Sequence, residues 1–269
     1  GAGMNKTSID WTDYTAGLIK STHAGGPVSF NGQEAQRILR TRTTGKRVLV
    51  KGDPFDEGVP DELLDRMFAV FALRPDLVFQ VLTKRPERMR AYFVNVDLRT
   101  DAIGDAMTTL TGRPVSGDPP DDTWDALDDL PLPNVWLGTS VENQAAAEKR
   151  IPELLATPAA VRFLSCEPLL EPVDLEPWLR RVATSGPGWR MTGGSAMAIA
   201  DIVLDWVIVG GESGPGARPC DVGWIRDIVG QCRAAGVAFW AKQGPGYKSE
   251  MPFGDAELDG VRELPGVGS

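Results

Sequence analysis

The chain has 269 residues, a mass of 29.0 kDa and a formal net charge of −9 at pH 7, so it can form one α/β domain and is too acidic to coat nucleic acid non-specifically. No stretch approaches the roughly 20 uninterrupted apolar residues of a membrane span. Three cysteines without a close pair and one histidine exclude a disulfide scaffold and a zinc site built from several imidazoles.

The ends of the chain carry little pattern. Residues 1–3 precede Met4 and are interpreted as a tag remnant, and no signal peptide follows them, so a cytoplasmic protein is expected. We expect one α/β barrel domain over residues 4–247. Residues 248–269 are interpreted as a tail.

The first half of the chain alternates strand and helix patterns. Residues 16–31 are rich in glycine and lack a period, which predicts a loop. Proline and acidic residues at Pro60 and Pro86 mark the starts of two helices. Strands are predicted over 7–14, 47–51 and 77–82, and a short basic helix over 33–42.

The second half continues the alternation around two irregular segments. We expect a solvated acidic insertion near residues 113–133 and a flexible loop near 183–197. Helices are predicted over 101–110, 142–156, 175–182 and 222–235, and strands over 135–141, 161–164, 207–209 and 237–241.

This alternation predicts a parallel sheet with right-handed crossovers. No glycine fingerprint of a dinucleotide-binding fold follows the first strand, which favours a barrel over a doubly wound sheet. The predicted fold class is therefore α/β, a parallel (β/α) barrel of the TIM type, complete or partial, with about 6–7 strands. A flavodoxin-like open sheet is the alternative.

Polar residues follow the predicted strands from the second onward. The carboxyl ends of parallel strands meet at one edge, where a barrel places its active site. Such a cluster of charges either pairs internally or receives a polar ligand. The candidate ligand-binding residues are Asp53, Lys84, Arg85, Ser140, Asn143, Ser213, Lys242 and Gln243.

Three carboxylates at these strand ends, Glu142, Glu167 and Glu212, are the candidate general acid and base. Cys166 is either a small buried apolar residue or a thiol activated by a neighbouring cation. No metal ligand set is predicted.

Several long strings have a familiar pattern, among them TSIDWTDYT at 7–15, VWLGTSVENQ at 135–144 and DWVIVGGESGPGARP at 205–219. Together they closely resemble a phage-associated protein family of uncharacterised function, with a radical-SAM-like barrel. The resemblance implies S-adenosylmethionine (SAM) and an iron–sulfur cluster held by a three-cysteine loop after the first strand. This chain has no cysteine between Ala16 and Asn31, where that loop is expected.

Three functions stay open, and whether the chain is an enzyme stays open with them. The first is a cluster-less barrel of phage type that binds a polar or anionic ligand, a nucleotide or nucleic-acid-related molecule, in nucleic-acid modification. The second is a non-catalytic module that binds a protein partner. The third is a radical SAM enzyme whose cluster loop is absent from this sequence. If phage-encoded, the protein would act in the cytoplasm of the bacterial host.

Overall fold

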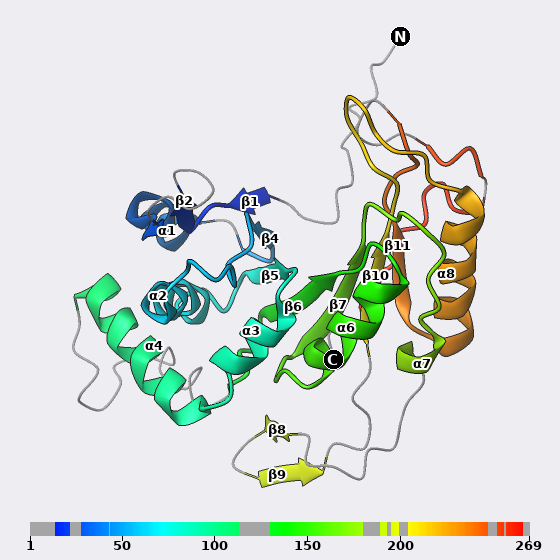
Figure 1. Ribbon diagram of the computed structural model, residues 1–269. Helices are drawn as coiled ribbons and strands as arrows, with labels where there is room; N and C mark the ends of the chain where they lie inside the picture. The colour runs from blue at the N-terminus through cyan, green and yellow to red at the C-terminus, as the bar shows by residue number, and fades with distance from the viewer. Residues whose placement is uncertain are drawn as a thin grey trace.

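The computed structural model describes residues 14–21, 28–42, 44–112, 130–179, 189–192, 195–198, 204–246, 252–255 and 257–265. A seven-stranded sheet is its main feature (Figure 1). Its strands are β1 (Tyr14–Ala16), β4 (Arg47–Val50), β5 (Val78–Thr83), β6 (Val135–Ser140), β7 (Val161–Cys166), β10 (Trp206–Val209) and β11 (Ala238–Ala241). The helices are α1 (Gly32–Arg40), α2 (Asp61–Ala72), α3 (Pro86–Tyr92), α4 (Val96–Thr111), α6 (Gln144–Leu155), α7 (Glu176–Leu179) and α8 (Val222–Ala235).

The order of the strands in the sheet follows their order in the chain. Each strand pairs in parallel with the next, from β1 to β11. The predicted α/β class with a parallel sheet is thus confirmed, and seven strands fall within the expected number. β1 and β11 occupy the two edges and are not paired with each other, so the described sheet is open.

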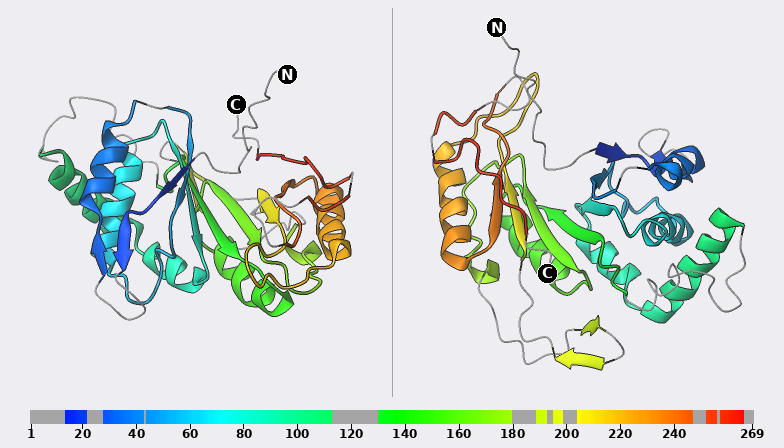
Figure 2. Two further views of the ribbon diagram at one scale, coloured as in Figure 1. Left: turned by 90° about the horizontal axis from the view of Figure 1, so that it is seen from above. Right: turned by 180° about the vertical axis from the view of Figure 1, so that it is seen from behind.

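Helices cover one face of the sheet. Seen from above, α2, α6 and α8 lie on the outer side of the curve from β1 to β11 (left panel of Figure 2). Strand residues such as Phe79, Leu137 and Val207 pack in the same fully buried core as Phe68 and Ile228 of these helices. The burial of this face is expected from the sequence patterns, because each crossover helix presents an apolar stripe to the sheet.

The other face of the sheet is buried mainly by the side chains of its own strands. The second apolar cluster consists of Trp136, Val161, Phe163, Trp206, Ile208 and Trp240, with Leu49, Val78, Leu82 and Ala238 packed against them. Every member lies on a strand of the sheet. The cluster extends across the sheet from β4 to β11.

A cation–π contact shows that the sheet is strongly curved, because four strands separate its two partners in the sheet order. The guanidinium carbon of Arg47, on the second strand of the sheet, lies 6.0 Å from the ring centroid of Trp240, on the last strand. Trp206 also stands edge-on to Trp136 and Trp240, with ring centroids 5.8 and 6.1 Å away. The concave face is therefore filled by aromatic side chains, as in the packed interior of a barrel rather than an open channel.

Two stretches predicted as loops contain short antiparallel strand pairs. β2 (Ile19–Ser21) pairs with β3 (Val28–Phe30), and β8 (Trp189–Thr192) pairs with β9 (Ser195–Ala198). Strands of three or four residues are too short to give a clear alternation in sequence, which is why the prediction of loops was wrong there. Residues 7–13 of the predicted first strand and 113–129 of the predicted acidic insertion lie outside the described residues.

The packed part of the chain continues beyond the expected boundary at residue 247. Residues 257–265 run beside β11, where Trp240 and Arg262 form an antiparallel bridge. The indole N–H of Trp206 donates to the carbonyl of Glu263 at 2.9 Å, and Leu258 is buried in the helix-side core. Part of the predicted tail thus covers one edge of the sheet.

None of the described helices is both long and apolar enough to cross a lipid bilayer.

The aromatic face gives a first testable prediction. A Cβ on Gly138 would lie 2.5 Å from the ring of Phe163, which is fully buried and cannot move freely. Gly138→Ala should therefore lower the free energy of unfolding by about 1–3 kcal/mol, measured by urea denaturation. Gly230→Ala is the control, because a Cβ there meets nothing within 4 Å and the position is helical, so it should be neutral or stabilising. Equal stability of Gly138→Ala and the unchanged protein would contradict the close packing.

Candidate functional site at the carboxyl edge of the sheet

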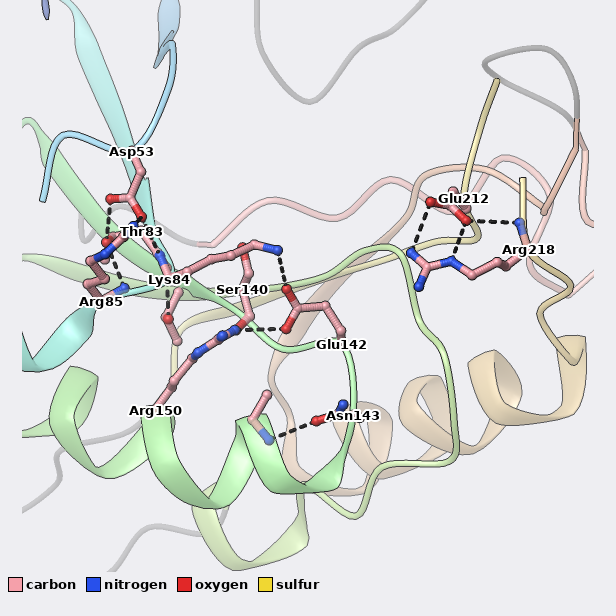
Figure 3. Close-up of polar contacts among 12 residues, drawn as sticks. Asp53, Thr83, Lys84, Arg85, Ser140, Glu142, Asn143, Arg150, Glu212 and Arg218 are labelled. Carbon is pink, nitrogen blue, oxygen red and sulfur yellow. Dashed lines mark hydrogen bonds and ion pairs between the residues drawn. The ribbon is translucent and has the colours of Figure 1, made fainter. Parts of the chain in front are cut away.

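The carboxyl edge of the sheet, where β4 to β11 end, carries the predicted site residues. Asp53 organises its first part (Figure 3). Its Oδ1 accepts a hydrogen bond from the Thr83 hydroxyl at 2.6 Å, and its Oδ2 accepts from the Lys84 amide at 3.0 Å and from Arg85 Nη1 at 2.9 Å. Arg85 also pairs with Asp56 at 2.8 Å. These bonds fix the turn from β5 into α3.

Glu142 forms the second part, between two cations. Its Oε1 lies 2.5 Å from Lys84 Nζ, and its Oε2 accepts from Arg150 Nη1 at 2.7 Å. The same Arg150 nitrogen donates to the Ser140 carbonyl at 2.8 Å. The Glu142 side chain is only 12% exposed, whereas that of Lys84 is 56% exposed. Lys84 is thus paired with a largely buried carboxylate while more than half of its own side chain is exposed to solvent.

The cations control the ionisation of Glu142. Burial by itself would raise the pKa of this carboxyl group, but the hydrogen bond from Lys84 and the charge of Arg150 outweigh it and lower the pKa below its ordinary value of 4.5. Glu142 is therefore ionised at neutral pH. A carboxylate in this state fits an electrostatic role better than that of a general acid.

Two further carboxylates are paired in the same manner. Glu167 lies 3.0 Å from Lys242 Nζ, joining the ends of β7 and β11. Glu212 accepts from the backbone amide of Arg218 at 2.8 Å and from its guanidinium at 2.7 and 3.0 Å. These hydrogen bonds lower the pKa of Glu212 to about 2. Glu212 is thus held as an anion within the glycine-rich turn after β10.

The parts of this edge interact electrostatically. The pKa of Arg218 is raised chiefly by its hydrogen bonds to Glu212, and the charge of Glu142 adds to the shift. Lys84 and Arg85 are consecutive residues that join the Asp53 and Glu142 groups. The structure therefore brings the carboxylates Glu142, Glu167 and Glu212 to one edge together with paired cations.

Other candidate residues have structural partners. Asn143 caps α6 by accepting from the Ala146 amide at 2.8 Å. Gln243 is 2% exposed and donates to the Gly211 carbonyl at 3.2 Å, and Ser140 is 5% exposed. Ser213 is exposed and forms a bridge with Gly246.

Cys166 is the last residue of β7, but its side chain belongs to the helix-side core and not to the charged network of this edge. Its side chain is fully buried, and burial strongly raises the pKa of the thiol. This placement favours the small buried apolar residue, one of the two interpretations that the sequence left open.

Sequence reasoning missed two cations of the site, Arg150 and Arg218. Arg150 is eight residues beyond Glu142, on α6, and Arg218 is six residues beyond Glu212. Only Arg218 had a signal in the sequence, since it follows Glu212 within the same glycine-rich turn. Lys51 adds an exposed cation at the end of β4, and none of the described groups pairs with its Nζ.

The three cysteines do not fit the iron–sulfur cluster that the resemblance implies. All three lie in the described part of the chain and are buried. Burial raises the pKa of Cys220 to about 11 and that of Cys232 to about 12, which opposes the thiolate form that ligates iron. Among the described residues, no group of three or more potential metal ligands comes together.

A separate polar groove of about 910 Å³ lies outside the predicted site. It is formed where α6 begins, beside α7 and α8, and none of the predicted site residues lines it. Its lining residues are Gln144, Pro172, Val173, Asp174, Glu176, Arg226, Asp227, Gly230 and Gln231.

The fold and this edge define a parallel α/β protein with a network of paired charges at the carboxyl ends of its strands. The chain belongs to a family described as protein of unknown function (DUF5131), whose sequence pattern matches residues 6–265. The expected membership of an uncharacterised family is thereby confirmed, while its phage association and radical-SAM-like character stay predictions. No curated protein and no solved structure matches the chain.

The Glu142 network gives a second prediction. Glu142→Gln leaves Lys84 and Arg150 without their counter-charge and should lower the free energy of unfolding at pH 7 by about 1–3 kcal/mol. Because folding lowers the pKa of Glu142, its stabilisation is present above about pH 4.5 and is lost as pH falls through the lower folded-state value. The difference between the two proteins, measured by urea denaturation from pH 7 to pH 3, should therefore shrink below pH 4.5.

Glu153→Gln is the matched control for this experiment. Glu153 pairs with Arg90 at 3.1 Å, but the two side chains are 32% and 49% exposed, so the substitution should cost less than about 1 kcal/mol. A loss that is equal in the two variants, or that does not depend on pH, would contradict the proposed role of Glu142.

Proposed function

We propose that this protein binds an anionic, nucleotide-like ligand at the carboxyl edge of its sheet. The arrangement of Lys84 carries the proposal: its ammonium group is held 2.5 Å from Glu142 while more than half of its side chain remains exposed. An ammonium group has three donors, and one ion pair leaves the others available to a phosphate. Lys51 and Lys242 add partly exposed cations at the ends of β4 and β11.

The neighbouring carboxylates suit the remaining groups of a nucleotide. Glu167 and Glu142 lie at the ends of adjacent strands and are acceptors for hydroxyl or amino groups. Their pairing with lysines keeps the donors and acceptors in fixed positions, which lowers the cost of ordering side chains on binding. A ligand that combines phosphate oxygens with sugar hydroxyls matches this alternation of charge better than a purely anionic one.

The proposal also includes a specific type of α/β fold. We take the sheet as a partial barrel, supported by the sequential strand order and by the aromatic cluster that its strands form on the concave face. The protein would then be a cluster-less, radical-SAM-like barrel of phage type, whose ligand is a nucleotide or part of a nucleic acid undergoing modification. The three buried cysteines support the absence of a cluster.

A non-catalytic module that binds a protein partner is the second candidate. Val94, Val96 and Leu98 favour it, because these exposed apolar side chains lie within five residues, from the connection after α3 into the first turn of α4. This candidate predicts that nucleotides do not stabilise the protein.

Ligand binding is tested by calorimetry and thermal shift with ATP, AMP and adenosine as probes. We expect ATP and AMP to bind and adenosine to bind much more weakly, because it lacks phosphate. Lys84→Gln should weaken ATP binding by roughly tenfold to a hundredfold, the loss of one hydrogen bond to a charged group.

Lys149→Gln is the control for this experiment. Lys149 is 73% exposed on α6 and lies 3.7 Å from Glu87, and it takes no part in the described ion pairs of Asp53 and Glu142. It should bind ATP as the unchanged protein does. Absence of binding by all three probes, or equal effects of the Lys84 and Lys149 substitutions, would overturn the proposal.

A further inference from the structure

A second charged surface lies at the opposite edge of the sheet. No aspartate or glutamate occurs between Ala35 and Lys51, in a chain whose net charge is −9. Residues 37–46 of this stretch, called the basic segment below, extend from the end of α1 to the start of β4. The cations of the basic segment are Arg37, Arg40, Arg42 and Lys46.

Contacts with the rest of the fold hold the two ends of the basic segment in place. Arg74, in the loop before β5, donates to the Ile38 carbonyl, and its guanidinium is paired with Asp76 at 2.6 Å. The Gly45 amide donates to the Asp76 carbonyl at 2.8 Å, and the Val78 amide donates to the Lys46 carbonyl at 2.9 Å. These contacts attach both ends of the segment to the rest of the domain.

The arginines of the basic segment do not take part in those contacts. Arg40 and Arg42 are exposed, and none of the described side chains pairs with either of them. Arg40, like Arg37, lies in the last turn of α1, where cations interact favourably with the helix dipole. Arg42 lies beyond the helix, so an interaction with the helix dipole does not explain why an exposed cation occurs there. Asp76, the acid nearest in these contacts, is already neutralised by Arg74.

We propose that the basic segment is a docking site for the phosphodiester backbone of a nucleic acid. Exposed guanidinium groups on a fixed backbone are suited to phosphate oxygens. A protein partner fits less well, because protein interfaces are built around an apolar centre. Among the described residues, the exposed large hydrophobic side chains are Val94, Val96, Leu98 and Leu264, and none of them belongs to the segment.

The basic segment is separate from the ligand site at the carboxyl edge. β4 begins at Arg47 beside the segment and ends at Val50 beside Lys51, a span of four residues or about 13 Å. A nucleic acid held at the segment lies on the same domain as the proposed nucleotide site without occupying it. The two proposals therefore stand or fall separately.

The test measures binding of a 25-nucleotide single strand and a 25-base-pair duplex of DNA by fluorescence anisotropy, from 50 to 200 mM salt. Arg40→Glu/Arg42→Glu should weaken binding at least about tenfold and reduce the slope of log K against log salt by about 2, one unit for each phosphate contact. Arg40→Gln/Arg42→Gln should have a smaller effect in the same direction. Thermal melts confirm that both variants are folded.

The matched control reverses two other exposed cations, Arg66 on α2 and Lys149 on α6. Arg66→Glu/Lys149→Glu changes the net charge equally and should bind DNA more tightly than the variant of the basic segment. Arg40→Glu/Arg42→Glu should leave ATP binding unchanged, because neither arginine lies at the carboxyl edge.

Three outcomes would overturn the proposal: no DNA binding at 50 mM salt, equal losses in the two double variants, or equal binding of a polyglutamate peptide of matched charge. The last result would assign the segment to an acidic protein partner. None of them bears on nucleotide binding at the carboxyl edge, which is measured separately.

Discussion

The packing of the sheet's concave face upon itself is the constraint on which the rest of the structure depends. Phe163 lies over Gly138, where no side chain larger than hydrogen fits without a shift, and Trp206 stands between Trp136 and Trp240. Among the described residues, the strands themselves contribute most of the side chains that bury this face, and the contact between Arg47 of β4 and Trp240 of β11 requires the sheet to curve. The curve gathers the strand ends, and the charged carboxyl edge follows from it.

That edge is organised as a set of hydrogen bonds and ion pairs between the ends of different strands. Asp53 joins the ends of β4 and β5, Lys84 and Glu142 join β5 and β6, and Glu167 and Lys242 join β7 and β11. Such pairs stabilise the turns that they connect, and in the proposed function the exposed Lys84 offers its remaining donors to a ligand. The same side chain can therefore both stabilise a turn and bind a ligand. The proposed function depends on the lysine of each carboxylate–lysine pair.

The sequence anticipated the order and type of the main elements well. The helix over 222–235 begins at a capping aspartate and ends at Gly236, and its predicted bounds agree with α8. The sequence also predicted that charged residues gather at the strand ends, because parallel strands share one carboxyl edge. The sequence could not show which of these charged residues pair. Arg150 contacts Glu142 from α6, and no spacing rule predicts that contact. The short pairs β2–β3 and β8–β9 gave no periodic signal.

By itself, then, the sequence determined the parallel α/β class, the succession of strands, the absence of a cysteine loop after the first strand, and the residues at the strand ends. These depend on local periodicity, composition and position in the chain. Only the tertiary structure decided that the sheet curves with its edges unpaired, that Cys166 faces the helices, and that Arg40 and Arg42 stand exposed beside a fixed loop. Those outcomes depend on contacts between distant residues, because side-chain packing and ion pairing are set by position in space.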